Sequence, residues 1–188
     1  MTLLETEMPE IPGKPEPVTL RDGTTVTIRP VRPDDAPRLQ ALFHRLSPES
    51  IALRFLGQPK ELPYKQAKQF ATVDYHKRMA LVAAREEGSE EHVIAVARYA
   101  VGPATEPDVA EAAIAVEDAY QNRGLGTLLL IRLVEYARKH GIRAFMATVR
   151  HDNVQIMRFI RKSGLPSERK LEAGVWEILV KLEPEADH

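Results

Sequence analysis

The segment that most constrains the fold is residues 121–126, Gln-Asn-Arg-Gly-Leu-Gly, which join a strand-like run to a helix. Residues 109–116 before it are mostly apolar and predict a strand. Residues 127–140 after it are rich in Leu and Arg and predict a helix that stops at Gly141. Gly124 and Gly126 lack a Cβ, so a ligand can approach the backbone there, and the free N–H groups of a helix start attract anions. The segment therefore predicts a phosphate cradle.

The spacing of the glycines narrows the choice of phosphate ligand. A dinucleotide-binding fingerprint needs a third glycine where Leu129 stands, and a nucleotide P-loop needs Gly-Lys-Ser/Thr, which does not follow. What remains is Gln-x-x-Gly-x-Gly followed by a Leu-rich helix. A plain loop before a helix can have the same residues, so the rest of the chain has to decide between the two interpretations.

The composition is that of a soluble globular protein with one domain. The 188 residues are 44% hydrophobic and 28% charged. No apolar run approaches the roughly 20 residues that cross a membrane. Residues 1–17 are acidic and Pro-rich and lack the features of a signal peptide, which predicts a flexible leader and a cytoplasmic protein. The chain has no cysteine, which excludes disulfides and a thiol nucleophile.

The net charge of −1 conceals an uneven distribution. Residues 121–165 contain nine Lys or Arg and two Asp or Glu, a balance of +7, so the rest of the chain carries −8. A basic segment around the predicted cradle suits a polyanionic small ligand. A solvated helix face, on which Glu135 and Lys139 form an i,i+4 pair, explains part of it. The basic residues are not interleaved with stacking aromatics, so nucleic acid is not an expected partner.

The remaining patterns predict the order of strands and helices. A hairpin is predicted at residues 18–30, then a helix capped by Asp34, and further helices at 48–55 and 63–73. Strands are predicted at 79–85 and 92–101, before the cradle, and at 143–149, after the cradle helix. A helix capped by Asp152 or Asn153 follows, and a hairpin of residues 169–171 and 175–182 closes the chain before a tail, 183–188.

The motif and this order of elements together resemble the Gcn5-related N-acetyltransferase (GNAT) family, which binds acetyl-CoA. The resemblance covers residues 18–182 and implies a single GNAT-type domain of the α/β (α+β) class, with a central mixed, mostly antiparallel sheet flanked by helices. Several segments also resemble the subgroup of bacterial protein lysine acetyltransferases that modify acyl-CoA synthetases. These segments are Asp22-Gly23, Ile28-Arg29-Pro30, Arg32-Pro33-Asp34-Asp35, Ser47-Pro48-Glu49-Ser50, Arg54-Phe55, Asp74-Tyr75 and residues 79–83.

The resemblance implies roles for individual residues. Glu111, ten residues before Gln121, stands at the offset at which related lysine acetyltransferases have their general base, although a solvent-facing strand residue would fit the same alternation. The strand after it would bind the pantetheine arm, the cradle would bind the pyrophosphate, and an asparagine would contact the rest of acetyl-CoA. The coenzyme-binding residues are thus Ile114, Ala115, Val116, Gln121, Asn122, Arg123, Gly124, Leu125, Gly126, Thr127 and Asn153.

One position departs from the family pattern. Many members have a tyrosine seven residues after the asparagine as general acid, and Ile160 stands there, which leaves the general acid unassigned. Asp74, Tyr75 and His76 are candidates for substrate binding, with packing as the alternative role. Acidic residues such as Asp74 and Glu111 near the thioester would favour a cationic acceptor.

The implied activity is acetyl-CoA-dependent transfer of an acetyl group to a lysine ε-amine of a protein, with acetyl-CoA synthetase as the expected target. No metal, nucleic acid or membrane is expected to take part. Two alternatives stay open. The same chemistry can act on a small amine, and the absent tyrosine is compatible with a non-catalytic module that senses acetyl-CoA.

Overall fold

An eight-stranded mixed sheet forms the centre of the computed structural model, which describes residues 12–183. The strand order is β1-β2-β3-β4-β5-β6-β8-β7, and among these strands only β5 and β6 pair in parallel. The strands are β1 Glu16–Thr19, β2 Thr25–Pro30, β3 Arg78–Glu87, β4 Glu90–Ala100, β5 Val109–Val116, β6 Ala144–Arg150, β7 Ser167–Glu172 and β8 Val175–Lys181. The helices are η1 Pro33–Asp35, α1 Ala36–Arg45, α2 Pro48–Phe55, α3 Tyr64–Ala71, η2 Asp118–Tyr120, α4 Leu125–Lys139 and α5 Val154–Ser163.

The order of elements confirms the predicted fold, and the differences lie at element boundaries. Helix α4 begins at Leu125, earlier than predicted, because Gly124 at φ +84° already serves as its N-cap. Strand β1 includes Glu16 and Pro17, which the sequence interpretation assigned to the leader. The rest of that leader up to residue 11, and the predicted tail from residue 184, lie outside the described residues.

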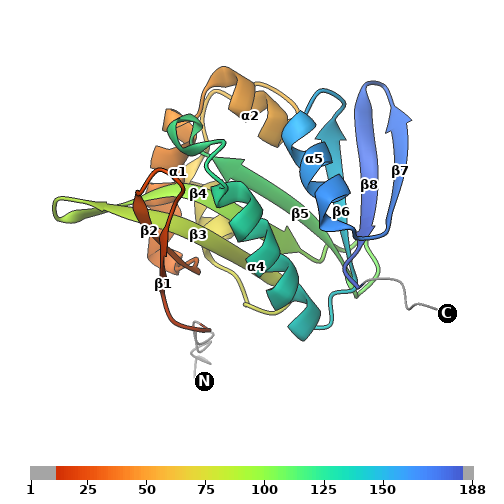
Figure 1. Ribbon diagram of the computed structural model, residues 1–188, viewed down its shortest axis with the longest axis horizontal. Helices are drawn as coiled ribbons and strands as arrows, with labels where there is room; N and C mark the ends of the chain where they lie inside the picture. Colours follow the sequence, from red (N-terminus) through yellow and green to blue (C-terminus); the bar gives the residue numbers. More distant parts are fainter. Residues whose placement is uncertain (1–11, 184–188) are drawn as a thin grey trace, which may run out of the picture.

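The helices cover both faces of the sheet. Helix α4 crosses one face of β3, β4 and β5, and α1 and α3 lie behind the sheet in the same view (Figure 1). The main core lies between these layers and includes Leu42, Tyr99, Leu129 and Leu133. A second, smaller cluster lies under α5, where Val149, Ile178 and Val180 pack against Ile156, Met157 and Ile160. None of the helices in residues 12–183 is long and apolar enough to span a membrane.

The core is divided in two because β5 and β6 separate. Their parallel pairing runs only from Val109 opposite Ala144 to Glu111 opposite Met146. Beyond this point β5 continues to pair with β4 as far as Val116, and β6 continues to pair with β8 as far as Arg150. Beyond Glu111 and Met146, β5 is therefore held only by β4 and β6 only by β8, and a wedge opens between the two halves of the sheet.

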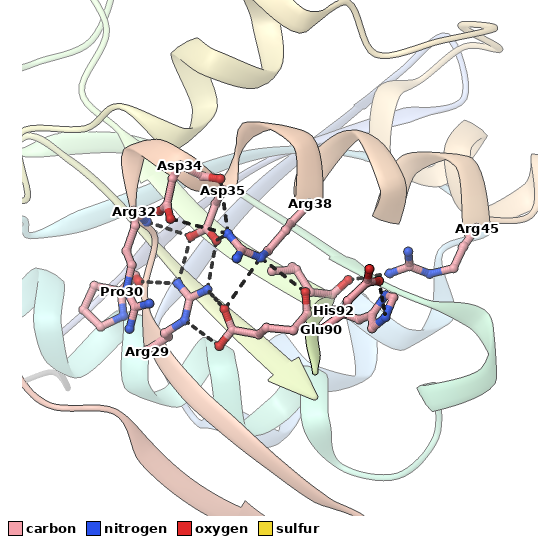
Figure 2. A network of polar contacts seen from close by, with 11 residues as sticks. Arg29, Pro30, Arg32, Asp34, Asp35, Arg38, Arg45, Glu90 and His92 are labelled. Atoms are coloured by element: carbon pink, nitrogen blue, oxygen red, sulfur yellow. Dashed lines mark hydrogen bonds and ion pairs between the residues drawn. The ribbon is translucent and has the colours of Figure 1, made fainter. Parts of the chain in front are cut away.

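A buried ion-pair network fixes the start of α1 to the sheet. Arg29 on β2 and Asp35 at the N-terminus of α1 are 2% and 0% exposed, and their side chains form two hydrogen bonds of 2.8 and 2.9 Å. The Arg29 guanidinium also donates to Glu91 on β4 at 2.6 Å, and Arg38 from α1 joins the same cluster (Figure 2). Every charge in this cluster therefore has an opposite charge beside it.

The structure corrects the predicted cap of this helix. Asp34 was expected to cap it, but the N-cap of α1 is Asp35, and its carboxylate accepts from the N–H of Arg32 before the helix, at 2.7 Å, and makes no capping bond to α1. Burial by itself would raise the pKa of the Asp35 carboxyl. The hydrogen bonds from Arg29 and from Arg32 outweigh burial and hold that pKa below its ordinary value.

This shift predicts a pH-dependent loss of stability. Because the folded-state pKa of Asp35 is depressed, the contribution of the pair is complete above the unfolded-state pKa of about 3.9 and is lost as the pH falls through the folded-state value. Asp35→Asn should lower the free energy of unfolding at pH 7, by at most about 3–5 kcal/mol, because it removes one partner of a buried pair. The variant should also lose less further stability than the wild type between pH 5 and pH 3. Urea denaturation across that range measures both effects, and parallel pH profiles for the two proteins would contradict this prediction.

Candidate active site

The wedge between β5 and β6 is a groove lined by three helices. Figure 1 shows α4 and α5 in front of the two strands and α2 across the upper end. Side chains and backbone from all five elements line the groove. They are Ser50, Leu53 and Arg54 of α2, residues 112–116 of β5, Gly126, Thr127 and Leu130 of α4, Ala147, Thr148 and Val149 of β6, and Asn153, Ile156, Phe159 and Ile160 at α5.

The backbone of β5 presents polar groups to this groove that pair with no neighbouring strand. The N–H of Glu117 donates to Ile94 on β4 at 2.9 Å, and alternate residues of a strand direct their N–H and C=O to opposite sides. The backbone groups of Ile114 and Val116 therefore point away from β4 and into the groove, beyond the last β6 pairing. Ala115, by contrast, is turned toward β4. An extended chain can bind along this edge as an added strand would.

The cradle predicted from the two glycines lies at the open end of the groove. Asn122 and Gly124 have positive φ values of +60° and +84°, which turn the chain sharply into α4. In residues 12–183 no protein acceptor is recorded for the backbone N–H groups of residues 122–127. Free N–H groups at the N-terminus of a 15-residue helix, in a site that carries the positive end of the helix dipole, suit a phosphate group.

Gly126 brings the first turn of α4 close to β5. A Cβ on this residue would lie 3.5 Å from the side chains of both Ile114 and Val116. This is ordinary van der Waals distance, so the first turn of α4 packs directly against the edge of β5. The cradle and the open backbone edge of β5 thus form one continuous surface.

Gln121 lines the groove beside the cradle, and its side chain is also hydrogen-bonded within the protein. Its Nε2 donates to Ser50 Oγ and to the backbone oxygen of Val116, both at 3.0 Å. Ser50 in turn donates to Asp118, whose carboxylate also accepts from the N–H and hydroxyl of Ser47. This chain of hydrogen bonds fixes the start of α2 and the end of β5 to the cradle, so the Gln121 side chain positions the site from within.

Asn153 and Ile160 both line the groove from α5. The Oδ1 of Asn153 accepts from the Ile156 N–H at 3.3 Å and so caps the helix, as predicted from the sequence. The cap uses only the Oδ1 atom of Asn153. Its Nδ2 donates to no protein acceptor within residues 12–183. Ile160 contributes an apolar surface to the inner part of the groove.

Glu111 lies at the closed end of the wedge, in the last residue pair that joins β5 to β6. Its side chain is exposed. Because side chains alternate along a strand, Glu111 projects from the face opposite to Ile114 and Val116, which contact α4. The carboxylate and the phosphate cradle are therefore at opposite ends of the groove and on opposite faces of β5.

The three candidates for substrate binding lie elsewhere, in the loop before β3, and none of them lines the groove. Asp74 accepts the backbone N–H groups of His76 and Arg78 at 2.9 and 2.8 Å. Tyr75 is buried and its hydroxyl donates to the Val31 carbonyl at 2.7 Å. The His76 ring packs edge-on against His140 at the far end of α4. These contacts shape the loop.

Two arginines that the sequence interpretation did not select belong to this region. Arg54 of α2 lines the groove, and Arg98 of β4 lies beside it in an adjoining cavity. Arg54 appeared only as part of a segment of resemblance, and Arg98 lies in an alternating strand where nothing marks it as unusual. No group of three or more His, Cys, Asp or Glu in the described part of the chain is arranged to hold a metal ion.

Comparison with known proteins identifies the family. The model of the acetyltransferase (GNAT) family matches residues 40–165, so the chain belongs to this family. The acetyltransferase PA5475 of Pseudomonas aeruginosa is 37% identical over 125 residues, which are 66% of this chain and 66% of that protein. The acetyltransferase Pat of Mycolicibacterium smegmatis is 32% identical over 151 residues, 80% of this chain and 44% of its own. The chain thus spans less than half of Pat.

A solved structure agrees with these sequence matches. The GNAT domain of S. lividans PAT superimposes with a TM-score of 0.77 at 35% identity, and covers 89% of this chain and 96% of that domain. The single α/β domain with its eight-stranded mixed sheet is therefore the GNAT fold.

The cradle can be tested with two glycines of similar backbone conformation at the two ends of α4. Gly124 (φ +84°) lies in the cradle, and Gly141 (φ +77°) ends the helix with open space around its Cβ position. Alanine at either position costs roughly 1–2 kcal/mol of backbone strain. We expect Gly124→Ala to weaken acetyl-CoA binding at least about tenfold, and Gly141→Ala to leave the affinity within about twofold. Isothermal titration calorimetry measures both, and equal affinities in the two folded variants would remove the cradle from the binding site.

Proposed function

We propose that this GNAT domain transfers the acetyl group of acetyl-CoA to a lysine ε-amine of a protein, with Glu111 as general base. The acceptor that we propose is an acyl-CoA synthetase, with acetyl-CoA synthetase as the first candidate. The observation that carries the proposal is the wedge itself. It has a phosphate-type cradle at one end, an open strand edge along its wall, and an exposed carboxylate where the two strands meet.

The residues along the groove fit the parts of acetyl-CoA in order. The N–H groups from Gly124 to Thr127 suit the pyrophosphate. The backbone of Ile114 and Val116 suits the amide groups of the pantetheine arm, whereas Ala115 contributes through its side chain. The free nitrogen of Asn153 can donate to the same arm from the opposite wall. Bound acetyl-CoA supplies the acetyl group as a thioester.

Glu111 has the chemistry that the acceptor requires. A lysine with a pKa of about 10.4 is almost entirely protonated at neutral pH and cannot attack a carbonyl group in that form. A carboxylate at the end of the groove can accept the proton of the amine, directly or through water, and a positioned base contributes about 10²–10⁴ in rate. An N–H of β5 that faces the groove can stabilise the carbonyl oxygen of the thioester as it gains negative charge.

The leaving thiolate does not need a protein acid. Ile160 occupies the position at which many family members have a tyrosine, and its side chain is an apolar part of the groove wall. A thiol with a pKa of about 8.5 is a fair leaving group, so water can protonate it. Tyr75 is not a substitute for the tyrosine, because its buried hydroxyl already donates to Val31.

The acceptor class rests on resemblance. The segments that resemble those of bacterial protein lysine acetyltransferases include Arg54, which lines the groove, and Arg29 and Asp35, which form the buried ion pair at the start of α1. The similar proteins bear the names acetyltransferase Pat and PAT. Acetylation of a small amine is the second candidate, and a module that only senses acetyl-CoA is the third, which Ile160 favours.

The base is tested with a matched pair of charge-removing variants. Glu111→Gln should keep acetyl-CoA affinity but lower turnover about 10²-fold or more at pH 7, with a smaller loss at pH 9, where more free amine is present. Glu106→Gln removes the same charge from an exposed position in the loop before β5 and should leave turnover within twofold. Turnover is measured with labelled acetyl-CoA, with a purified acyl-CoA synthetase and small amines in parallel.

Two outcomes of that assay would contradict parts of the proposal. A Glu111→Gln enzyme within a factor of two of the wild type from pH 7 to pH 9 would dismiss Glu111 as base. Acetylation of small amines with far higher kcat/KM, and none of the synthetase, would leave the acetyltransferase activity and overturn the protein acceptor.

A further inference from the structure

Two arginines meet in a cavity that branches from the groove on the acceptor side of the sheet. Arg54 comes from α2 and lines both the groove and this cavity. Arg98 comes from β4 and lines the cavity, which lies between the sheet and α1–α3. The other walls are apolar and include Leu46, Phe70 and Ala115. Two cationic side chains thus line a cavity whose other walls are apolar.

Neither guanidinium has an anionic partner. In residues 12–183 no carboxylate lies within 4.0 Å of either side chain, and neither donates a recorded hydrogen bond. The Nη1 atom of Arg98 is buried and without any hydrogen-bond partner. The contacts that hold the two side chains are aromatic. Arg98 stacks 4.0 Å from the Phe70 ring centre, and Arg54 lies 4.7 Å from that of Phe55.

This arrangement contrasts with that of Arg29, which is buried, whereas Arg54 and Arg98 are half-buried. Arg29 has two carboxylates beside it and the pKa of its guanidinium is raised. Burial lowers the pKa of Arg54 to about 10, and burial together with Arg54 and Arg78 lowers that of Arg98 to about 10. Both groups therefore stay charged at neutral pH. Two partly desolvated like charges lie here without a counter-ion, and the buried Nη1 of Arg98 has no partner, so a bound anion would be stabilised at this place.

The phosphate of the cradle cannot be that anion. The cradle adjoins Ile114 and Val116 on the α4 face of β5. Arg98 lies opposite Ala113 in the β4–β5 ladder, so its side chain projects from the other face, the one that carries Glu111 two residues along. The unpaired charges therefore lie on the side from which an acceptor would approach the proposed base.

We propose that Arg54 and Arg98 form a carboxylate-binding site at the acyl end of the groove. The carboxylate is carried either by the acyl chain of the CoA thioester or by the acceptor, close to its amine. A guanidinium pairs with a carboxylate through two parallel hydrogen bonds, and the small apolar cavity suits this planar anion. This inference rests on the proposed function, because it assumes that an acyl-CoA occupies the groove.

Matched ligand pairs distinguish the two sources. In the donor arm, calorimetry compares succinyl-CoA with butyryl-CoA, which has a chain of the same length without the charge. In the acceptor arm, acetyl transfer compares lysine with lysinamide, and a lysine peptide of a synthetase with the neighbouring residue as Glu or as Gln. We expect at least a tenfold preference for the carboxylate in one arm, and that arm identifies the source.

Arg98→Met should abolish this preference while binding of acetyl-CoA itself stays within about threefold, because Arg98 does not line the groove. Arg54→Met should abolish the preference as well. The ligand-free Arg98→Met protein should also melt at the same temperature as the wild type or higher, because a partly desolvated charge with an unpartnered, buried Nη1 is removed. Arg29→Met is the matched control. It removes a buried arginine that has its partners, and it should lower the melting temperature and leave the ligand preference unchanged.

Two results would overturn the inference. One is normal acetyl-CoA binding with no carboxylate preference in either arm, which leaves the proposed function intact. The other is a preference that survives in both arginine variants. Failure of acetyl-CoA to bind would instead overturn the proposed function, and this inference with it.

Discussion

The separation of β5 from β6 is the constraint on which the rest of the structure depends. Parallel strands pair only while their backbones stay about 4.8 Å apart, and these two remain paired for three residue pairs. The split is tolerated because β4 holds β5 and β8 holds β6 along their further lengths. Each half has its own apolar cluster, so opening the wedge does not expose a core. The cost is a short row of backbone groups without partners, and the Gln121 side chain satisfies the last of these, the carbonyl of Val116.

The polar residues of this domain serve stability and function in different places. Around Arg29 each buried charge has a partner, and the network fixes the first helix to the sheet (Figure 2). Arg54 and Arg98, by contrast, are half-buried beside the groove without an anionic partner, and Nη1 of Arg98 is buried without a hydrogen bond. A folded protein can retain residues that lower its stability when those residues contribute to binding. Residues that serve function therefore often lower stability. Arginine thus stabilises the fold at one place in the domain and costs stability at another.

Local signals in the sequence predicted most of the fold. Alternating apolar residues, the Asp22-Gly23 turn and the glycines at 124 and 164 gave the order of strands and helices, because each depends on residues that are close in the chain. The predicted cradle and the Asn153 cap also depend on local geometry. Contacts between residues that are far apart in the chain could not be predicted from the sequence. Arg29 meets Glu91 across 62 positions, and Tyr75 reaches Val31 across 44. The shared cavity of Arg54 and Arg98 and the hydrogen bonds of Gln121 also depend on residues that are distant in the chain. The position of Asp74 away from the groove depends on such contacts as well.

Amide hydrogen exchange, measured by NMR with and without acetyl-CoA, tests the central claim that the coenzyme completes the open edge of β5. The N–H groups of Ile114 and Val116 face the groove, whereas those of Ala113 and Ala115 already face β4. Binding should therefore slow exchange in an alternating pattern, strongly at Ile114, Val116 and the cradle from Gly124 to Thr127, and little at Ala113 and Ala115. Uniform slowing along the whole strand, or none at Ile114 and Val116 when the coenzyme is bound, would contradict a coenzyme that lies in the wedge.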